Sequence, residues 1–430
     1  MITTLVVVAF VAAYVLIATE RIHRVAAALW GAAAMVVLGA VDARTAFFSE
    51  ETGVDWNVIF LLLGMMLIVG VLRQTGVFEY LAIWAAKRAR GRPFAVMVML
   101  VVITAVASAL LDNVTTVLLI APVTLLVCDR LGVPPVPYLI AEAMASNIGG
   151  TATLVGDPPN IIIASRSGLS FNDFLVHMAP IATLLVVVFV GLCWLLFRKG
   201  LTHDPERAAA VMGLDEREAI QDRGLLVRSL VVLALVLAGF MAHSVTGVEP
   251  SVVALMGAGA LVALSRLEPR DYLRDVEWPT LVFFAGLFVM VGALVHVGVV
   301  EHVGHALRDA VSGRLLLGST VILWGSAALS GVIDNIPYVA TMAPIVRDLA
   351  GGVGADQQHQ ALWWALALGA DLGGNATAVG ASANVVILGI AARNDHPISF
   401  WRFTKYGLVV AAVTVAVAWG YLWLRYFAFA

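Results

Sequence analysis

Five carboxylic acids lie within or beside long apolar runs of the chain: Asp112, Glu142, Asp157, Asp334 and Asp371. An ionised carboxylate at the centre of a bilayer costs about 2.5–3.5 kcal/mol on insertion scales, so such residues usually serve an ion pathway. We take Asp112, Asp334, Glu142 and Asp371 as candidate proton carriers. For Glu142 and Asp371 the alternative is a neutral, hydrogen-bonded structural role.

Two of these acids precede an asparagine at a break inside an apolar stretch. Asp112-Asn113 divides the segment 94–128, and Asp334-Asn335 divides the segment 315–349. A helix that stops at such a polar tip predicts a re-entrant hairpin, whose backbone must be satisfied by protein or by a water cavity. The tip offers carbonyl groups and a carboxylate to a cation or proton, and N–H groups to an anion. The alternative is that both aspartates only cap the helices that follow.

A glycine-rich break follows each hairpin, at Gly149–Asn160 and at Gly373–Asn384. The first contains two prolines, which remove N–H donors and interrupt a helix, and the unwound carbonyls can bind an ion. The alternative is close helix packing through small residues. The tips and breaks together predict the following ion- or substrate-binding residues: Asp112, Asn113, Thr115, Asp334, Asn335, Gly150, Thr151, Thr153, Asp157, Asn160, Asn375, Thr377, Ser382 and Asn384.

The elements that position these residues recur as an internal repeat. The blocks 54–64, 110–123, 147–163 and 170–174 match 276–286, 332–345, 371–387 and 399–403, in the same order and at nearly constant offset. Each copy then holds three spans, one hairpin and two further spans. Since five crossings are an odd number, the second copy is predicted to be inverted, as in many secondary transporters.

We therefore expect an all-α polytopic membrane protein with a first repeat at 1–199, a polar cytoplasmic linker at 200–224 and an inverted second repeat at 225–430. The segments 76–92 and 300–314 are expected to form amphipathic helices at the membrane interface.

Basic residues set the predicted orientation. With the N-terminus outside, 20 of the 26 Lys and Arg face the cytoplasm, as the positive-inside rule requires. We therefore expect both termini outside a cell membrane, either an inner or a plasma membrane. The first hairpin then enters from the cytoplasm and the second from outside, which brings their tips together inside the membrane.

Composition excludes several other classes of function. The chain has 430 residues, of which 61% are hydrophobic and 13% charged, so the bilayer is its natural solvent. Its net charge is −3, and nucleic acid is not an expected partner. Cys128 and Cys193 form no paired motif, and no phosphate-binding loop is present. We expect no cofactor, and no metal beyond a transported or coupling sodium ion.

The tip and break motifs resemble the ArsB/NhaD ion transporter superfamily over nearly the whole chain, and within it the P protein subgroup. The residues that carry the likeness are LLDNVTTVLLIAPVT (110–124), NIGGTATLVGDPPNIII (147–163) and GADLGGNATAVGASANVVILGIA (369–391). Related dicarboxylate/sodium symporters have Ser-Asn-Thr at each tip, where this chain has Asp112-Asn113-Val114 and Asp334-Asn335-Ile336. The resemblance implies an elevator-type transporter, usually a homodimer. It further implies arsenite or antimonite efflux, Na⁺/H⁺ antiport or anion transport, and in the arsenite case a separate ATPase subunit.

The sequence thus favours a secondary transporter for a small ion, coupled to protons or sodium and without enzymatic activity. A passive ion channel, a dicarboxylate/sodium symporter and an intramembrane hydrolase with paired aspartates are the alternatives.

Overall fold

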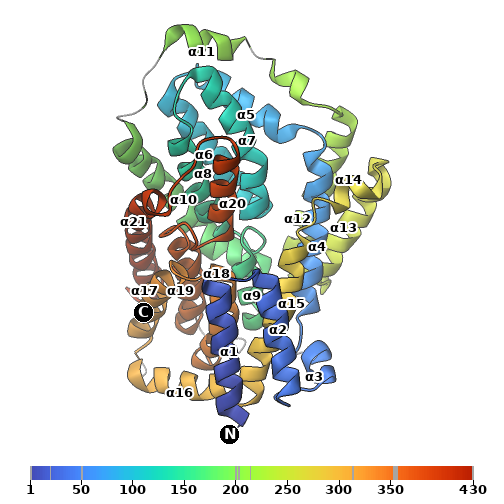
Figure 1. Cartoon of the computed structure of the whole chain (residues 1–430), viewed down its shortest axis with the longest axis vertical. Coiled ribbons are helices and arrows are strands. Elements are labelled where there is room, and N and C mark those ends of the chain that lie inside the picture. The colour runs from blue at the N-terminus through green and yellow to red at the C-terminus, as the bar shows by residue number, and fades with distance from the viewer. Residues whose placement is uncertain are drawn as a thin grey trace.

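The computed structural model describes residues 2–19, 21–49, 52–198, 201, 204–213, 215–311, 314–351 and 357–428. Within these ranges every regular element is a helix (Figure 1). The helices of the first half are α1 (Ile2–Thr19), α2 (Arg24–Val37), α3 (Ala43–Phe48), α4 (Trp56–Arg73), α5 (Val77–Arg88), α6 (Pro93–Leu110), α7 (Asn113–Leu131), α8 (Val136–Gly150), α9 (Pro158–Ser167) and α10 (Phe171–Phe197).

Two short helices, α11 (Pro205–Met212) and η2 (Glu216–Ala219), connect the halves. The helices of the second half are α12 (Arg223–Thr246), α13 (Pro250–Ser265), α14 (Pro269–Leu273), α15 (Trp278–His296), α16 (Val299–Val311), α17 (Leu315–Ser330), α18 (Asn335–Leu349), α19 (Gln357–Gly373), α20 (Ser382–Arg393) and α21 (Phe400–Tyr426).

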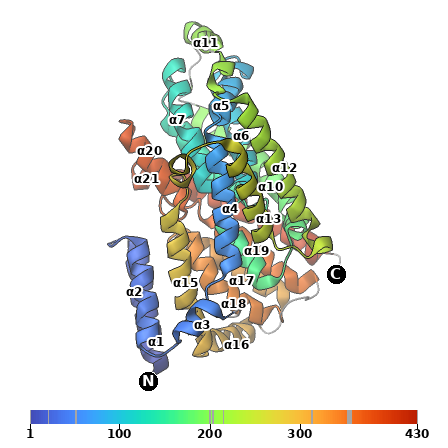
Figure 2. The ribbon, with the colours of Figure 1, turned by 90° about the vertical axis from the view of Figure 1, so that its right-hand side faces the viewer.

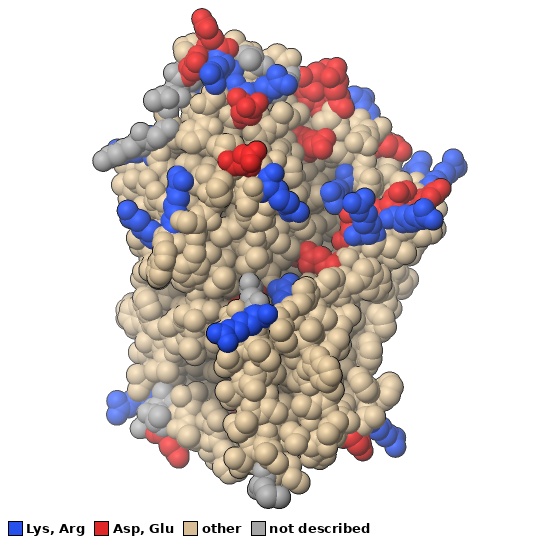
Figure 3. Space-filling model, viewed as in Figure 1, with Lys and Arg blue, Asp and Glu red and all other residues tan. Residues whose placement is uncertain are grey.

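Eight of the described helices are long and apolar enough to cross a membrane, and four more are apolar but shorter. Their exposed faces carry large apolar side chains such as Trp30, Val187 and Leu235, which water would not solvate. In Figure 3 much of the lower half of the visible face is uncharged, whereas Lys, Arg, Asp and Glu gather on the upper half. The all-α, multi-pass membrane fold predicted from composition is confirmed.

The third long helix of each half packs against the second long helix of the other half. Helix α4 lies on α13, and α15 lies on α2 (Figure 2). Glycines allow both approaches, because a Cβ on Gly64 would stand 2.7 Å from the backbone of Ala254 and one on Gly286 would stand 3.0 Å from that of Ala28. Figure 2 shows α1–α2 at one edge and α12–α13 at the other, with α4 and α15 between them.

Both helix breaks predicted from the Asp-Asn pairs are present. Helix α6 ends at Leu110 and α7 begins at Asn113, whereas α17 ends at Ser330 and α18 begins at Asn335. Hairpin 1 (α6–α7) lies in the upper half of Figure 1 and hairpin 2 (α17–α18) in the lower half. The chain therefore places the two hairpins at opposite ends of one helical body.

The segments expected to be amphipathic are helical, as α5 and α16, and lie at the top and bottom of Figure 1. The connecting linker runs over the top of the same view. Its described part is held to α5 by a Lys87 Nζ–Glu216 Oε2 ion pair of 2.5 Å, and the Gln221 N–H donates to Thr75 O at 3.0 Å. Lys199, Gly200 and His203 of this region lie outside the described residues.

Candidate functional site

Two interrupted helices cross the centre of the molecule. The first is interrupted between α8 and α9, and the second between α19 and α20. Each interruption is closed by one asparagine. The Asn160 Nδ2 donates to the carbonyls of Gly150 (3.3 Å) and Thr153 (3.1 Å), and the Asn384 Nδ2 donates to those of Gly374 (2.8 Å) and Thr377 (2.9 Å). These bonds use unwound carbonyls that the interrupted helix leaves unpaired.

Matched hydroxyls tie each interruption to its own hairpin tip. Thr153 Oγ1 donates to Ala109 O at 2.5 Å, and Thr377 Oγ1 donates to Gly331 O at 2.6 Å. A second matched pair joins the same elements: Ser108 Oγ to Ser146 O at 2.7 Å, and Ser330 Oγ to Ala370 O at 2.6 Å. The two halves thus build the same local frame with equivalent residues.

Glycines bring the interrupted helices against the hairpins. A Cβ on Gly149 would stand 2.2 Å from Ala105 O, and one on Gly373 would stand 2.5 Å from both Cα and O of Ala327. Close packing through small residues is therefore present at these breaks. It accompanies the unwound carbonyl groups, which Asn160 and Asn384 bind, and does not replace them.

Asp157 is the point at which both hairpin tips meet. Its fully buried carboxylate accepts a hydrogen bond of 2.8 Å from Asn113 Nδ2 of hairpin 1. Asn335 Nδ2 of hairpin 2 lies 3.4 Å from both of its oxygens. The sequence predicted that the tips would approach each other, but it did not predict that their asparagines would share one acid of the first break.

Asn147 joins the two halves beside this acid. Its Nδ2 donates to Asn375 Oδ1 (3.0 Å) and Asn384 Oδ1 (3.1 Å), and its Oδ1 accepts from Asn113 Nδ2 (3.2 Å). Asn147 was not among the predicted site residues. The signal that could have found it is its alignment with Asp371 in the repeat.

Asp371 occupies the corresponding place in the second half. It is fully buried, and the side chains of Asn160 and Thr151 face it. Neither of its carboxylate oxygens has a hydrogen-bond partner among the described residues. Asp371, Asp334 and Asp112 all lie close enough to Asp157 for their charges to interact. Within the described ranges, no Lys or Arg forms an ion pair with Asp157 or Asp371.

The two tip aspartates differ in their surroundings. Asp112 Oδ1 accepts the Thr115 N–H at 2.8 Å, which is a helix cap. Asp334 also caps its helix, through the Ile336 N–H at 3.1 Å, and in addition accepts Ser382 Oγ at 2.6 Å. Arg24 Nη1 lies 3.5 Å from Asp334 Oδ2, a contact that the sequence did not predict.

Glu142 makes no hydrogen bond to the residues of the tips and breaks that the structure describes. It is buried between α7 and α8, where Oε1 accepts a hydrogen bond from Thr124 Oγ1 and Oε2 has no partner among the described residues. No group of three or more His, Cys, Asp or Glu side chains in the described part of the chain is arranged to hold a metal ion.

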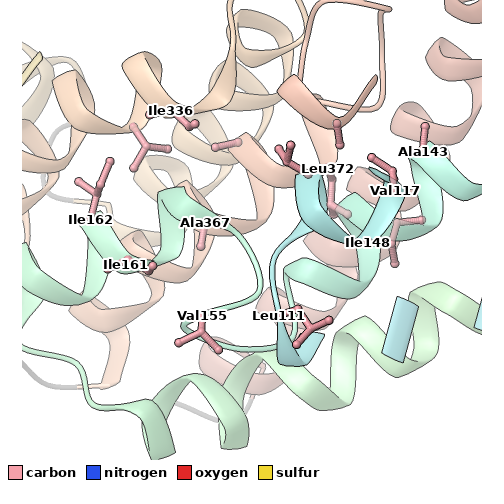
Figure 4. Packing of buried hydrophobic residues seen from close by; sticks show 14 of the residues in the cluster. Leu111, Val117, Ala143, Ile148, Val155, Ile161, Ile162, Ile336, Ala367 and Leu372 are labelled. Atoms are coloured by element: carbon pink, nitrogen blue, oxygen red, sulfur yellow. The ribbon is translucent and has the colours of Figure 1, made fainter. Parts of the chain in front are cut away.

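Apolar side chains surround the tips and breaks. Figure 4 shows Leu111, Val155, Ile161, Ile336 and Leu372 packed around the ends of the half-helices. All five are at most 4% exposed. This shell removes water from the cluster, so each charge inside it needs a polar or ionic partner.

Comparison with known proteins identifies the family. The family described as citrate transporter (CitMHS) matches residues 14–369. The chain belongs to this family. An uncharacterized transporter of Mycobacterium tuberculosis is 58% identical over 418 residues, which is 97% of either chain. The P protein of Sus scrofa is 35% identical over 497 aligned positions, covering 97% of this chain and 59% of that longer protein.

The fold also has a solved counterpart. The crystal structure of the Alcanivorax borkumensis YdaH transporter superposes with a TM-score of 0.58 at 16% identity, over 90% of this chain and 87% of that one. The resemblance to the ion transporter superfamily and its P protein subgroup is confirmed. The protein is a multi-pass membrane transporter.

Proposed function

We propose that this transporter moves a small ion by coupling it to a proton or sodium ion bound between the two hairpin tips. The observation that carries the proposal is the pair Asp157 and Asp371. Both carboxyl groups are fully buried, and no arginine or lysine of the described chain pairs with either. Two unpaired charges in such a place are strongly unfavourable, so a proton or cation must accompany them.

The surrounding groups suit both parts of the cargo. Unpaired acceptors remain on Asn113 Oδ1, Asn160 Oδ1 and both oxygens of Asp371, which favours a cation or proton. An unpaired donor remains on Asn375 Nδ2, which favours a neutral or anionic partner. The remaining predicted residues Gly150, Thr151, Thr153, Thr377, Ser382 and Asn384 hold this arrangement in place.

The matched contacts of the two halves support an inverted duplication. Hairpin tips, closing asparagines and tying hydroxyls recur at equivalent positions, while the hairpins lie at opposite ends of the body in Figure 1. We propose that 1–199 and 225–430 are inverted units that work as an elevator in a homodimer. Both termini then face the outside of the cell membrane.

Arsenite or antimonite efflux and Na⁺/H⁺ antiport remain the leading activities in this proposal, and an arsenite carrier would admit a separate ATPase subunit. The family description adds citrate as a candidate cargo. The donor at Asn375 and the guanidinium of Arg24 are the groups that would face a carboxylate. A symporter for such an anion is therefore the second candidate.

Flux into proteoliposomes tests the proposal. Sodium, arsenite, citrate and phosphate are presented with and without a pH gradient, and a proton-sensitive dye reports coupling. Asp157→Asn and Asp371→Asn should each lower coupled flux about 100-fold, because each removes a buried charge that the cargo or proton must neutralise. Asp129→Asn, an exposed residue of α7, is the matched control and should transport normally. Full coupled flux in both buried variants would contradict the proposal.

A further inference from the structure

A cavity of about 530 Å³ opens beside the second hairpin tip. Its wall combines the start of α2, the start of α15, the second helix of hairpin 1 and the start of α20. The groups with polar or charged atoms on this wall include His23, Arg24, Glu277, Thr280, Asp334 and Ser382. The cavity therefore brings an element outside both hairpins, α2, against the proposed ion site.

Arg24 makes the contact across this cavity. Its Nη1 donates to Ser382 Oγ at 2.7 Å and lies 3.5 Å from Asp334 Oδ2, while Ser382 Oγ donates to the same carboxylate oxygen at 2.6 Å. The guanidinium also lies over the ring of Phe283, 5.6 Å from its centroid. With side-chain exposures of 30% for Arg24 and 18% for Asp334, this is a partly buried, charge-assisted contact.

A second carboxylate faces the same cavity. Glu277 accepts Thr280 Oγ1 through Oε2 at 3.0 Å, and its Oε1 has no hydrogen-bond partner among the described residues. Glu277 lies within electrostatic range of Arg24. The guanidinium therefore has two acids near it, one on the hairpin tip and one on the neighbouring helix start.

We propose that Arg24 is a tethered counter-ion for Asp334. It neutralises this carboxylate while no transported cation or proton is bound, and it moves toward Glu277 when one binds. The inference rests on the proposed function and names Arg24 as a positioning residue of the same site. An ion that competes with a built-in guanidinium binds more weakly, but Asp334 then adds no unpaired charge to the empty site when the carrier resets.

Net transport and exchange separate this role from a purely structural one. Net flux without a counter-transported ion requires the empty carrier to reset, whereas exchange of bound ion for bound ion does not. We therefore expect Arg24→Gln to slow net flux of radiolabelled sodium or of dye-reported protons about tenfold, and to lower the apparent KM for that ion by a similar factor. Exchange should stay within about threefold of the unmodified protein.

Two further variants sharpen the experiment. Arg24→Lys keeps the charge and should restore most net flux, and Arg21→Gln, an exposed change in the same connection, should have no effect. A thermal double-mutant cycle of Arg24→Gln with Asp334→Asn should be non-additive, because the two side chains are in contact. Two results would overturn the inference. One is an Arg24→Gln protein whose net flux and exchange fall by the same factor, and the other is additive changes in thermal stability in the double-mutant cycle.

The two proposals fail in different ways. Full coupled flux in both Asp157→Asn and Asp371→Asn contradicts the proposed function, whatever Arg24→Gln does. Coupled flux that is lost in Asp157→Asn while Arg24→Gln behaves as the unmodified protein contradicts only the role of Arg24.

Discussion

The two hairpin tips carry the same Asp-Asn pair and both aspartates cap a helix, yet among the described residues only one of the two aspartates makes further side-chain contacts. Asn113 and Asn335 both reach Asp157, from opposite ends of the body. Asp112 does no more than cap its helix among the contacts described, whereas Asp334 also binds Ser382 and Arg24. The position that matches Ser382 in the first half is Pro158, which has no hydroxyl group to donate.

The same difference extends to the acids of the two breaks. Asp157 matches Ala381 in the repeat, and Asp371 matches Asn147. The duplicated frame of glycines, hydroxyls and asparagines therefore holds charges that are not duplicated. Because the charges differ between the two halves, a binding site between them can suit a cation on one side and a neutral or anionic ligand on the other.

The largest expected effect comes from filling the space at the two glycines that pack the helix breaks against their hairpins, and it tests whether the two packings are equally close. Gly149→Ala would place a Cβ 2.2 Å from Ala105 O, and Gly373→Ala would place one 2.5 Å from the Ala327 backbone. Each should cost about 3 kcal/mol of stability, since backbone atoms must move apart. Thermal unfolding in detergent measures this cost. Gly191→Ala, whose Cβ would meet no atom within 4 Å, is the control. A large difference between the two core variants would show that the frames are not equivalent.

The tip asparagines should differ in effect on transport. Asn113→Ala removes a 2.8 Å bond to Asp157 and a 3.2 Å bond to Asn147, whereas Asn335→Ala removes only contacts of 3.4 Å. Leaving buried polar groups unsatisfied costs about 1–3 kcal/mol each, so we expect coupled flux to fall about 100-fold and about tenfold, respectively. Equal losses of coupled flux in the two variants would mean that both asparagines contribute equally to holding Asp157.

The tip aspartates should show the opposite order. Asp334→Asn removes the negative charge that faces Arg24 and should lower net flux about tenfold. Asp112→Asn should lower it less than about threefold, because asparagine caps a helix nearly as well as aspartate. If Asp112→Asn proved the more damaging change under the same pH gradient, a role beyond capping would have to be assigned to that residue.

The smallest effect concerns the linker that docks beside hairpin 1. The Lys87 ammonium, by its hydrogen bond and charge, holds the pKa of the Glu216 carboxyl below its ordinary value of 4.5. A lowered pKa means that this contact stabilises docking fully above pH 4.5, and that the stabilisation disappears as the pH falls through the lowered pKa.

Limited proteolysis of the linker between pH 7 and pH 3 measures this docking, over the range in which the carboxyl gains its proton. We expect cleavage to accelerate at the acidic end. Glu216→Gln should be cleaved at the faster rate throughout, and Glu218→Gln, an exposed neighbour, should behave as the unmodified protein. A Glu216→Gln profile that keeps the full pH dependence would assign that dependence to another group.

The sequence by itself determined the membrane class, the helix breaks at both Asp-Asn pairs and the family resemblance, and it offered candidate site residues at the tips and breaks. These features are local. Apolar run length, proline and glycine positions and motif spacing act within a few turns of the chain, so they can be read without knowing how the helices pack.

Only the tertiary structure decided which of those residues meet. Asp157 became the common partner of both tips because an interrupted helix of the first half passes between hairpins that lie at opposite ends of the body. Asn147 and Arg24 joined the network through contacts with residues more than two hundred positions away. Such pairings depend on the crossing of half-helices in three dimensions, and no periodicity along the chain encodes them.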